Sequence, residues 1–128
     1  MLLLDTHVFV WLASAQKNLS NLAKQTISQN ADKLFISSIS ALEIAILVKR
    51  NRLRLPVETG EFVERALQQH GIHEIPVDRR VAIASTSLPD IHNDPFDRII
   101  LATALLNDMS VLSKDRVFPQ YQDVKVIW

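Results

Sequence analysis

Five carboxylates occupy positions where the chain is expected to turn at one rim of a sheet, namely Asp5, Glu43, Asp94, Asp97 and Asp115. Asp5 closes the apolar run of residues 2–4, and Asp115 follows that of residues 111–112. Glu43 lies in the first turn of a predicted helix, and Asp94 and Asp97 open another. Because like charges repel, a stable fold gathers such residues only around something positive. The pattern predicts a hard divalent-cation site suited to phosphodiester chemistry.

The elements that must position these acids alternate between strand and helix. Short apolar runs predict buried parallel strands at residues 1–5, 34–37, 73–77, 110–113 and 124–127. Amphipathic, capped patterns predict helices between them at residues 21–29, 41–50, 62–70, 79–86 and 95–107. This alternation predicts an α/β fold, a three-layer α/β/α sandwich around a mostly parallel sheet of about five strands.

Parallel topology explains how acids far apart in the sequence reach one place. The carboxyl ends of parallel strands share one edge, where ligands bind in open α/β sheets. Asp5 and Asp115 end strands at that edge, and Glu43 begins a helix that leaves it. Helix 95–107 runs antiparallel to the strand that follows it, so its amino end is expected there as well.

Each acid also has a structural explanation that involves no cation. Ser40 and Glu43 have the spacing of a capping box, which is the preferred explanation for Glu43 taken alone. Asp94 suits the N-cap of its helix, and Asp97 suits the helix dipole. Asp115 fits an ordinary turn. Asp5 is hardest to explain in this way, because an acid ending a buried strand needs a cation, a cap or donors.

Length and composition indicate one globular domain over residues 1–128, with 48% hydrophobic and 22% charged residues. The absence of cysteine excludes disulfides, thiolate metal sites and cysteine nucleophiles. The first residues lack the basic region of a signal peptide, and no apolar run approaches the roughly 18 residues that span a bilayer. A cytoplasmic protein without a membrane segment is therefore expected.

The formal net charge of zero conceals a segregation of charge. The chain has 14 Lys and Arg against 14 Asp and Glu, so the residues outside the five-acid cluster carry an excess of five positive charges. A positively charged surface around a pocket whose acids are neutralised by metal is compatible with a polyanionic substrate. If these positive charges were spread evenly over the surface, their excess would indicate no particular ligand. The one dense basic cluster is Lys49, Arg50, Arg52 and Arg54, which suits either a solvated helix end or contact with RNA or a partner.

Other polar and aromatic residues give weaker signals. The four histidines lack ligand spacing, so a structural or exposed role is preferred even for His7 and His92, which lie near the predicted site. Phe9 and Trp11 are interpreted as core. Lys114, Arg116 and Arg98 are candidates for stabilising developing charge, and nothing in the sequence selects among them.

Oxygen-only ligands select Mg²⁺ or Mn²⁺ over zinc or copper. Such an ion polarises a phosphoryl oxygen and lowers the pKa of a bound water, which then attacks the phosphorus. There is no glycine-rich phosphate loop, which argues against nucleotide-triphosphate binding of the P-loop type.

Four motifs in this order closely resemble the PIN domain family, in particular the VapC-type toxins of prokaryotic toxin–antitoxin modules. They are Leu-Leu-Asp5-Thr-His, Ser37-Ser-Ile-Ser40-Ala-Leu-Glu43-Ile, His92-Asn-Asp94-Pro-Phe-Asp97-Arg98 and Leu112-Ser-Lys-Asp115. The resemblance spans essentially the whole chain. Its most specific part is the Asp-Pro-Phe-Asp-Arg block together with the amino-terminal Asp.

The resemblance implies a PIN-like fold and an endoribonuclease dependent on Mg²⁺ or Mn²⁺. By motif, the metal-binding catalytic quartet would be Asp5, Glu43, Asp97 and Asp115. Asp94 would be an accessory acid, and Ser113 stands where the family more often has threonine. The resemblance also implies a homodimer and inhibition by a small DNA-binding antitoxin, for which helix 41–48, Leu53 and Leu55 are candidate contacts.

Two other functions remain open from the residues. A metal-dependent phosphatase or DNA nuclease would present the same ligands, because metal-assisted phosphoryl chemistry looks alike at that level. A non-catalytic PIN-like module that binds RNA or a partner is the other alternative, and the intact quartet argues against it.

Overall fold

The computed structural model describes residues 1–128 and contains one five-stranded sheet. The strands are β1 (Leu2–Leu4), β2 (Leu34–Ser37), β3 (His73–Ile75), β4 (Ser110–Leu112) and β5 (Val126–Ile127). All neighbouring pairs are parallel, in the order β3-β2-β1-β4-β5. The predicted parallel sheet is therefore confirmed, with β1 at its centre.

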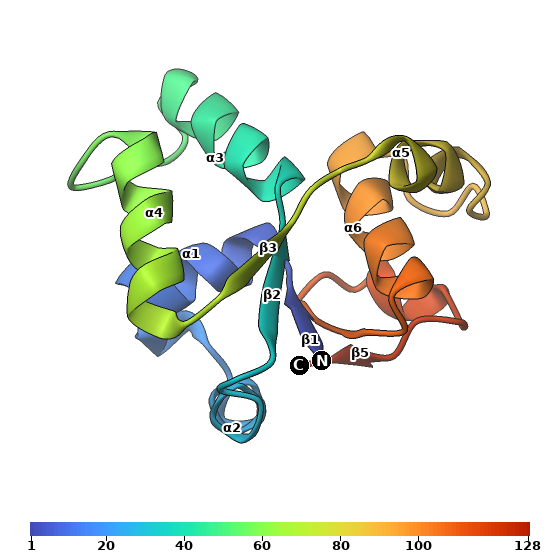
Figure 1. Ribbon diagram of the computed structural model, residues 1–128, viewed down its shortest axis with the longest axis horizontal. Helices are drawn as coiled ribbons and strands as arrows, with labels where there is room; N and C mark the ends of the chain where they lie inside the picture. The colour runs from blue at the N-terminus through green and yellow to red at the C-terminus, as the bar shows by residue number, and fades with distance from the viewer.

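Six α-helices and two 3₁₀ helices surround the sheet. They are α1 (Thr6–Ser14), η1 (Gln16–Asn18), α2 (Asn21–Gln29), α3 (Ile39–Lys49), α4 (Thr59–His70), α5 (Arg79–Thr86), α6 (Pro95–Leu106) and η2 (Phe118–Gln120). Figure 1 shows α1, α3 and α4 on one face of the sheet and α5 and α6 on the other, which confirms the three-layer prediction. None of the helices has the length and hydropathy to cross a membrane.

The two faces of the sheet support two separate cores, because side chains alternate along a strand. Leu2 and Leu4 of β1 belong to a cluster of 16 buried residues shared with α1, α3 and α4. Leu3 points the other way, into a cluster of 9 buried residues formed mainly with α6 and the segment that follows β4. Asp5, the next residue, is thus held at the end of a strand that is fixed on both faces.

Several predicted caps are confirmed, and they fix the helix ends. Ser20 Oγ accepts the Ala23 N–H at 3.0 Å, and Asp78 Oδ1 accepts the Val81 N–H at 2.9 Å. Gly71 ends α4 with φ of 61°, a left-handed conformation that glycine adopts without strain.

Two local predictions differ from the structure. Helix α1 was not predicted, because its sequence is apolar nearly all round and shows no helical periodicity. Helix α3 begins at Ile39 with Ser38 as the N-cap residue, so the predicted start at Ala41, with Ser40 as its cap, is wrong. Ser40 lies inside the helix, where its buried hydroxyl is hydrogen-bonded to Thr6 Oγ1 at 2.9 Å.

Candidate metal centre

Asp5 leaves β1 and enters α1, and both of its carboxylate oxygens are committed. Oδ1 accepts the Thr6 N–H at 2.7 Å, so Asp5 is the N-cap of α1. Oδ2 accepts the Ser113 hydroxyl at 2.7 Å across the neighbouring strand end. The residue is only 6% exposed, and burial raises the pKa of its carboxyl, while these hydrogen bonds act in the opposite direction.

Ser113 connects two of the acids. Its hydroxyl donates to Asp5 and accepts the Asp115 N–H at 3.0 Å, which joins the ends of β1 and β4. Asp115 Oδ1 in turn accepts the Val117 N–H at 2.8 Å, so one oxygen shapes the turn and Oδ2 remains on the side of the other acids. A hydroxyl at position 113 thus orients the Asp5 carboxylate and fixes the backbone from which the Asp115 side chain projects.

Glu43 does not cap its helix. Since α3 starts two residues earlier than predicted, the capping-box explanation of Glu43 is wrong. Its Oε1 is buried and accepts no hydrogen bond. Burial raises the pKa of the Glu43 carboxyl, and the nearby charge of Asp5 raises it further. A buried carboxylate oxygen with no donor is costly unless a cation or a proton reaches it.

Asp94 and Asp97 occupy the amino end of α6. Asp94 Oδ1 accepts the Phe96 N–H at 2.9 Å, which is the cap that the sequence predicts. Asp97 lies one turn into the helix and is 9% exposed. Burial and the charges of the surrounding carboxylates raise the pKa of Asp97 to about 8, so without a cation this group holds its proton near neutral pH.

All five predicted carboxylates line one cavity of about 410 Å³ at the carboxyl edge of the sheet. The lining consists of Asp5, His7, Val8, Trp11, Glu43, Asp94, Asp97, Lys114 and Asp115. Four segments contribute to it, because β1, β4 and the starts of α3 and α6 meet at this edge. The convergence follows from the parallel topology.

His92 is a site residue for which the sequence favoured a structural or exposed role. Its Nε2 lies 2.9 Å from Asp97 Oδ2 and 3.1 Å from Asp115 Oδ2. One ligand atom from each of these three residues lies within 4.8 Å of the others. The only sequence signal was its place just before the Asp-Pro-Phe-Asp block, because a loop residue has no periodicity from which its direction can be predicted.

Arg98 holds the loop that carries His92 and is not available to a substrate. Its guanidinium donates to the backbone carbonyls of Ser85, Leu88, Pro89 and His92, at 2.9–3.2 Å. Of the three cations that the sequence left open, only Lys114 lines the cavity with the acids. Arg116 is exposed on the neighbouring surface.

This donor set fits a metal ion. Five carboxylates and one imidazole offer mainly hard oxygen ligands, and Glu43 Oε1 has no other partner. The raised pKa of Asp97 points the same way, because it reflects charge that the protein does not neutralise by itself. The cluster is therefore able to bind a cation.

A parallel α/β sandwich with clustered carboxylates at the carboxyl edge of its sheet defines a class of α/β protein that places its ligand site at that edge. The family model described as PIN domain matches residues 2–124. Ribonuclease VapC22 of Mycobacterium tuberculosis is 33% identical over 115 residues, which cover 89% of this chain and 86% of that protein. The chain belongs to the PIN domain family.

Two solved structures share the fold of this chain. The crystal structure of VapBC2 from Rickettsia felis bound to a promoter DNA fragment has a TM-score of 0.74 and 13% identity, over 98% of this chain and 96% of that one. A toxin–antitoxin complex from Klebsiella pneumoniae has a TM-score of 0.69 and 21% identity, over 100% of this chain and 97% of that one.

Proposed function

We propose that this protein is a metal-dependent endoribonuclease and the toxin of a type II toxin–antitoxin pair. The observation that carries the proposal is the cavity in which five carboxylates converge, with one buried oxygen of Glu43 lacking any partner. Membership of the PIN family and the similarity to Ribonuclease VapC22 support RNA as the substrate. The whole chain, residues 1–128, acts as one PIN domain in this proposal.

The proposed ligands of the ion, Mg²⁺ or Mn²⁺, are Asp5, Glu43, Asp97 and Asp115. An ion bound there would neutralise charge on a phosphate oxygen and would lower the pKa of a bound water. Asp94 caps α6 and lines the cavity as an accessory acid. Ser113 fixes the orientation of the Asp5 carboxylate and holds the backbone of Asp115. His92 touches Asp97 and Asp115 and positions both carboxylates.

The protein's own groups have defined tasks in this scheme. Asp97 gives up its proton when the site is filled, because a nearby cation favours the charged carboxylate. Asp5 is held by two donors, which fix the orientation of its carboxylate. Lys114 is the one Lys or Arg side chain that lines the cavity, so it is placed to meet a phosphate that approaches the acids.

An antitoxin and a second copy of the chain are the proposed protein partners, because the neighbours of known structure include toxin–antitoxin complexes. On α3, Leu42 is 50% exposed and available for such contact. Leu53 and Leu55, which the sequence also suggested, are partly buried against the first core, so they offer less surface than expected. A cytoplasmic location completes the proposal.

The decisive experiment is Asp5→Asn, which removes one charge at nearly constant volume. Expression of the wild-type protein is expected to arrest growth, and the purified protein to cleave RNA with Mg²⁺ or Mn²⁺. The variant should do neither, with activity reduced at least about a hundredfold. Asp32→Asn, in the exposed turn before β2, is the matched control and should behave as wild type. Equal cleavage by wild type and Asp5→Asn would overturn the site assignment.

A further inference from the structure

A second cavity, of about 350 Å³, lies beside the loop that carries His92 and shares no residue with the carboxylate cavity. Its volume lies within the range of pockets that hold small molecules. Three segments line it, namely the loop between α5 and α6, the end of α6, and η2 with the turn that follows. The lining residues are Leu88, Pro89, Ile91, Leu105, Gln120, Tyr121, Gln122, Asp123 and Val124.

The walls of this second cavity are largely apolar, although it is open to solvent. Ile91 and Leu105 both line it, and each is 37% exposed. They are two of the six large hydrophobic side chains that the fold leaves exposed. Tyr121 and Val124, which are buried, also line the cavity. Apolar side chains that stay exposed around a concave site are typical of a surface that binds the apolar part of a ligand.

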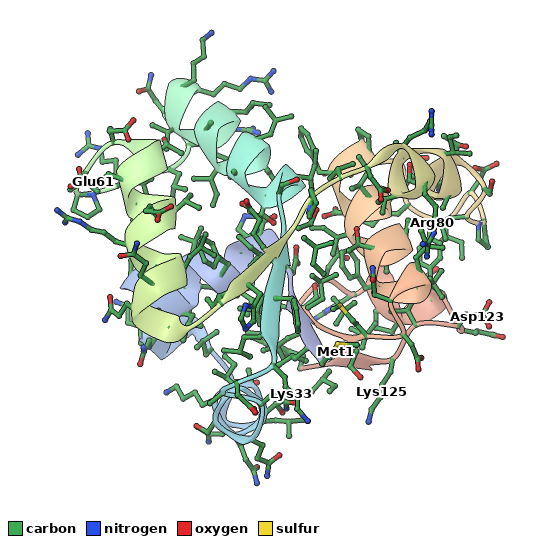
Figure 2. All side chains as sticks on the ribbon, viewed as in Figure 1. Met1, Lys33, Glu61, Arg80, Asp123 and Lys125 are labelled. Atoms are coloured by element: carbon green, nitrogen blue, oxygen red, sulfur yellow. The ribbon has the colours of Figure 1, made fainter.

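Asp123 is the only charged residue that lines the second cavity, and it forms no ion pair. Figure 2 shows it at the edge of the molecule, on the same side as α5 and α6. The nearby cations have other partners, since Arg80 donates to the Leu106 carbonyl at 3.3 Å and Arg98 donates to four carbonyls. An apolar cavity with one unpaired carboxylate is complementary to a ligand with an apolar body and a cationic head.

Tyr121 connects the second cavity to the carboxylate cavity. It lines the second cavity, and its hydroxyl accepts the His92 N–H at 2.8 Å and donates to the Pro89 carbonyl at 3.0 Å. Three residues of the loop just before His92 line the same cavity. The His92 imidazole in turn lies 2.9 Å from Asp97 and 3.1 Å from Asp115. A ligand in the second cavity therefore touches both the loop and the side chain that hold His92.

We propose that the second cavity binds a small organic cation, a primary amine on an aromatic or branched aliphatic body. The apolar body packs between Ile91 and Leu105, and the ammonium group pairs with Asp123. Because the cavity exists only while the loop contacts Tyr121, binding of the ligand and closure of the loop favour each other. An occupied cavity thus fixes the position of His92. The inference goes beyond the proposed ribonuclease function, and the binding does not depend on RNA cleavage.

Binding is measured by NMR titration of the ¹⁵N-labelled protein with 2-phenylethylammonium chloride, and with neutral 2-phenylethanol for comparison. Mg²⁺ is present, because it competes for the carboxylate cavity. A Kd of about 10 mM is expected for so small a probe, with amide shifts at Ile91, Leu105 and Gln122. The cation should bind about threefold more tightly than the alcohol, the size of an exposed ion pair. Shifts confined to His7 and Lys114 would place the probe in the carboxylate cavity and overturn the proposal.

Two variants test the walls and the charge separately. Leu105→Trp fills the second cavity and should weaken binding of both probes at least tenfold. Leu22→Trp, at a leucine of α2 that is 50% exposed, is the matched control and should leave binding unchanged. Asp123→Asn should remove the preference for the cation without changing the affinity for the alcohol, whereas Asp32→Asn should keep it. Equal affinities in wild type and Leu105→Trp would overturn the assignment of the site.

The link to His92 is measured as solvent exchange of its backbone N–H. At a probe concentration three times the Kd, exchange should slow about fourfold, because the loop opens only when the cavity is empty. Tyr121→Phe keeps the ring but loses the hydroxyl that holds His92, so it should bind the probe within about twofold of wild type and show no slowing. Unchanged exchange in the wild-type protein with probe bound would overturn the link.

A second copy of the chain is the competing occupant of these apolar walls. If Leu105→Trp turns a dimer into a monomer in analytical ultracentrifugation, and the probe shifts neither Ile91 nor Leu105, the cavity is an interface between copies and the proposal fails. A wild-type protein that cleaves no RNA would contradict the ribonuclease proposal and leave these binding results as they are. The two proposals can therefore fail independently.

Discussion

At the scale of single residues, Asp97 has the most informative environment. It lies among four other carboxylates and is nearly buried, so the protein without metal stabilises its protonated form. Asp5 and Glu43 are shifted in the same direction, by burial first. The site is therefore strained electrostatically when empty of cations, and this strain is what a bound ion relieves.

This strain predicts a pH dependence for the metal-free protein. The pKa of Asp97 is 3.8 when unfolded and about 8 when folded. Below pH 4 both states hold the proton, and the stabilisation is fully present. Between pH 4 and pH 8 the unfolded state releases the proton first, so stability falls as pH rises. Thermal melts in chelator should show Tm decreasing over this range.

Asp97→Asn should remove much of that dependence. At pH 8 in chelator the variant is expected to melt roughly 5 °C above wild type, because a neutral side chain replaces a repelled charge. Asp32→Asn, exposed in a turn, should leave the slope unchanged. A variant that kept the full wild-type slope would refute the role given to Asp97.

At the scale of elements, the loop between α5 and α6 depends on one side chain from α6. Arg98 donates to four carbonyls of residues 85–92 and lies close to the Tyr121 hydroxyl, which itself accepts the His92 N–H at 2.8 Å. The His92 ring also packs edge-on against Phe118, with centroids 5.9 Å apart. The loop is thus fixed from two sides, which sets the direction of the imidazole.

Arg98→Ala is expected to lower the free energy of unfolding by about 2–3 kcal/mol, since several carbonyls lose a charged donor. Chemical denaturation measures this change. Arg65→Ala is the matched control, because the exposed Arg65–Glu61 pair on α4 contributes at most about 0.5 kcal/mol. Equal losses in the two variants would show that Arg98 is not a structural clamp.

The elements also show where sequence reasoning succeeds. Strands β1, β2 and β4 were predictable because short, fully buried runs are apolar on both faces. Helix α1 has buried residues on most sides, so its sequence shows no helical alternation of apolar and polar residues. For this reason the helix was not predicted. The start of α3 was misplaced by two residues, because Ser38 and Ser40 are both acceptable caps and only tertiary contact distinguishes them.

At the scale of the whole molecule, the site is an effect of topology. The five acids were predictable as a group, because parallel strands bring their carboxyl ends to one edge. The contact of His92 with Asp97 and Asp115 was not predictable, since it depends on the loop that Arg98 and Tyr121 hold. The contact between Trp11 and Trp128 was equally hidden, because it joins residues from the first helix and the last strand region.

Metal binding should stabilise the entire fold, because the ligands come from four separate segments. At free Mn²⁺ a hundredfold above its Kd, the free energy of unfolding should rise by about 2.7 kcal/mol. Differential scanning fluorimetry with and without chelator measures this as a rise in Tm. Asp5→Asn should lose most of the Mn²⁺ response, and a full response in that variant would argue against Asp5 as a ligand.

The hydrogen bond from Ser113 to Asp5 spans 108 residues of sequence. During synthesis on the ribosome, Asp5 emerges early, but its partner arrives only when most of the chain has been made. A growing chain that has not yet placed β4 has neither Ser113 nor Asp115 at the cavity. The proposed ribonuclease site is thus incomplete until β4 has been synthesised and placed beside β1.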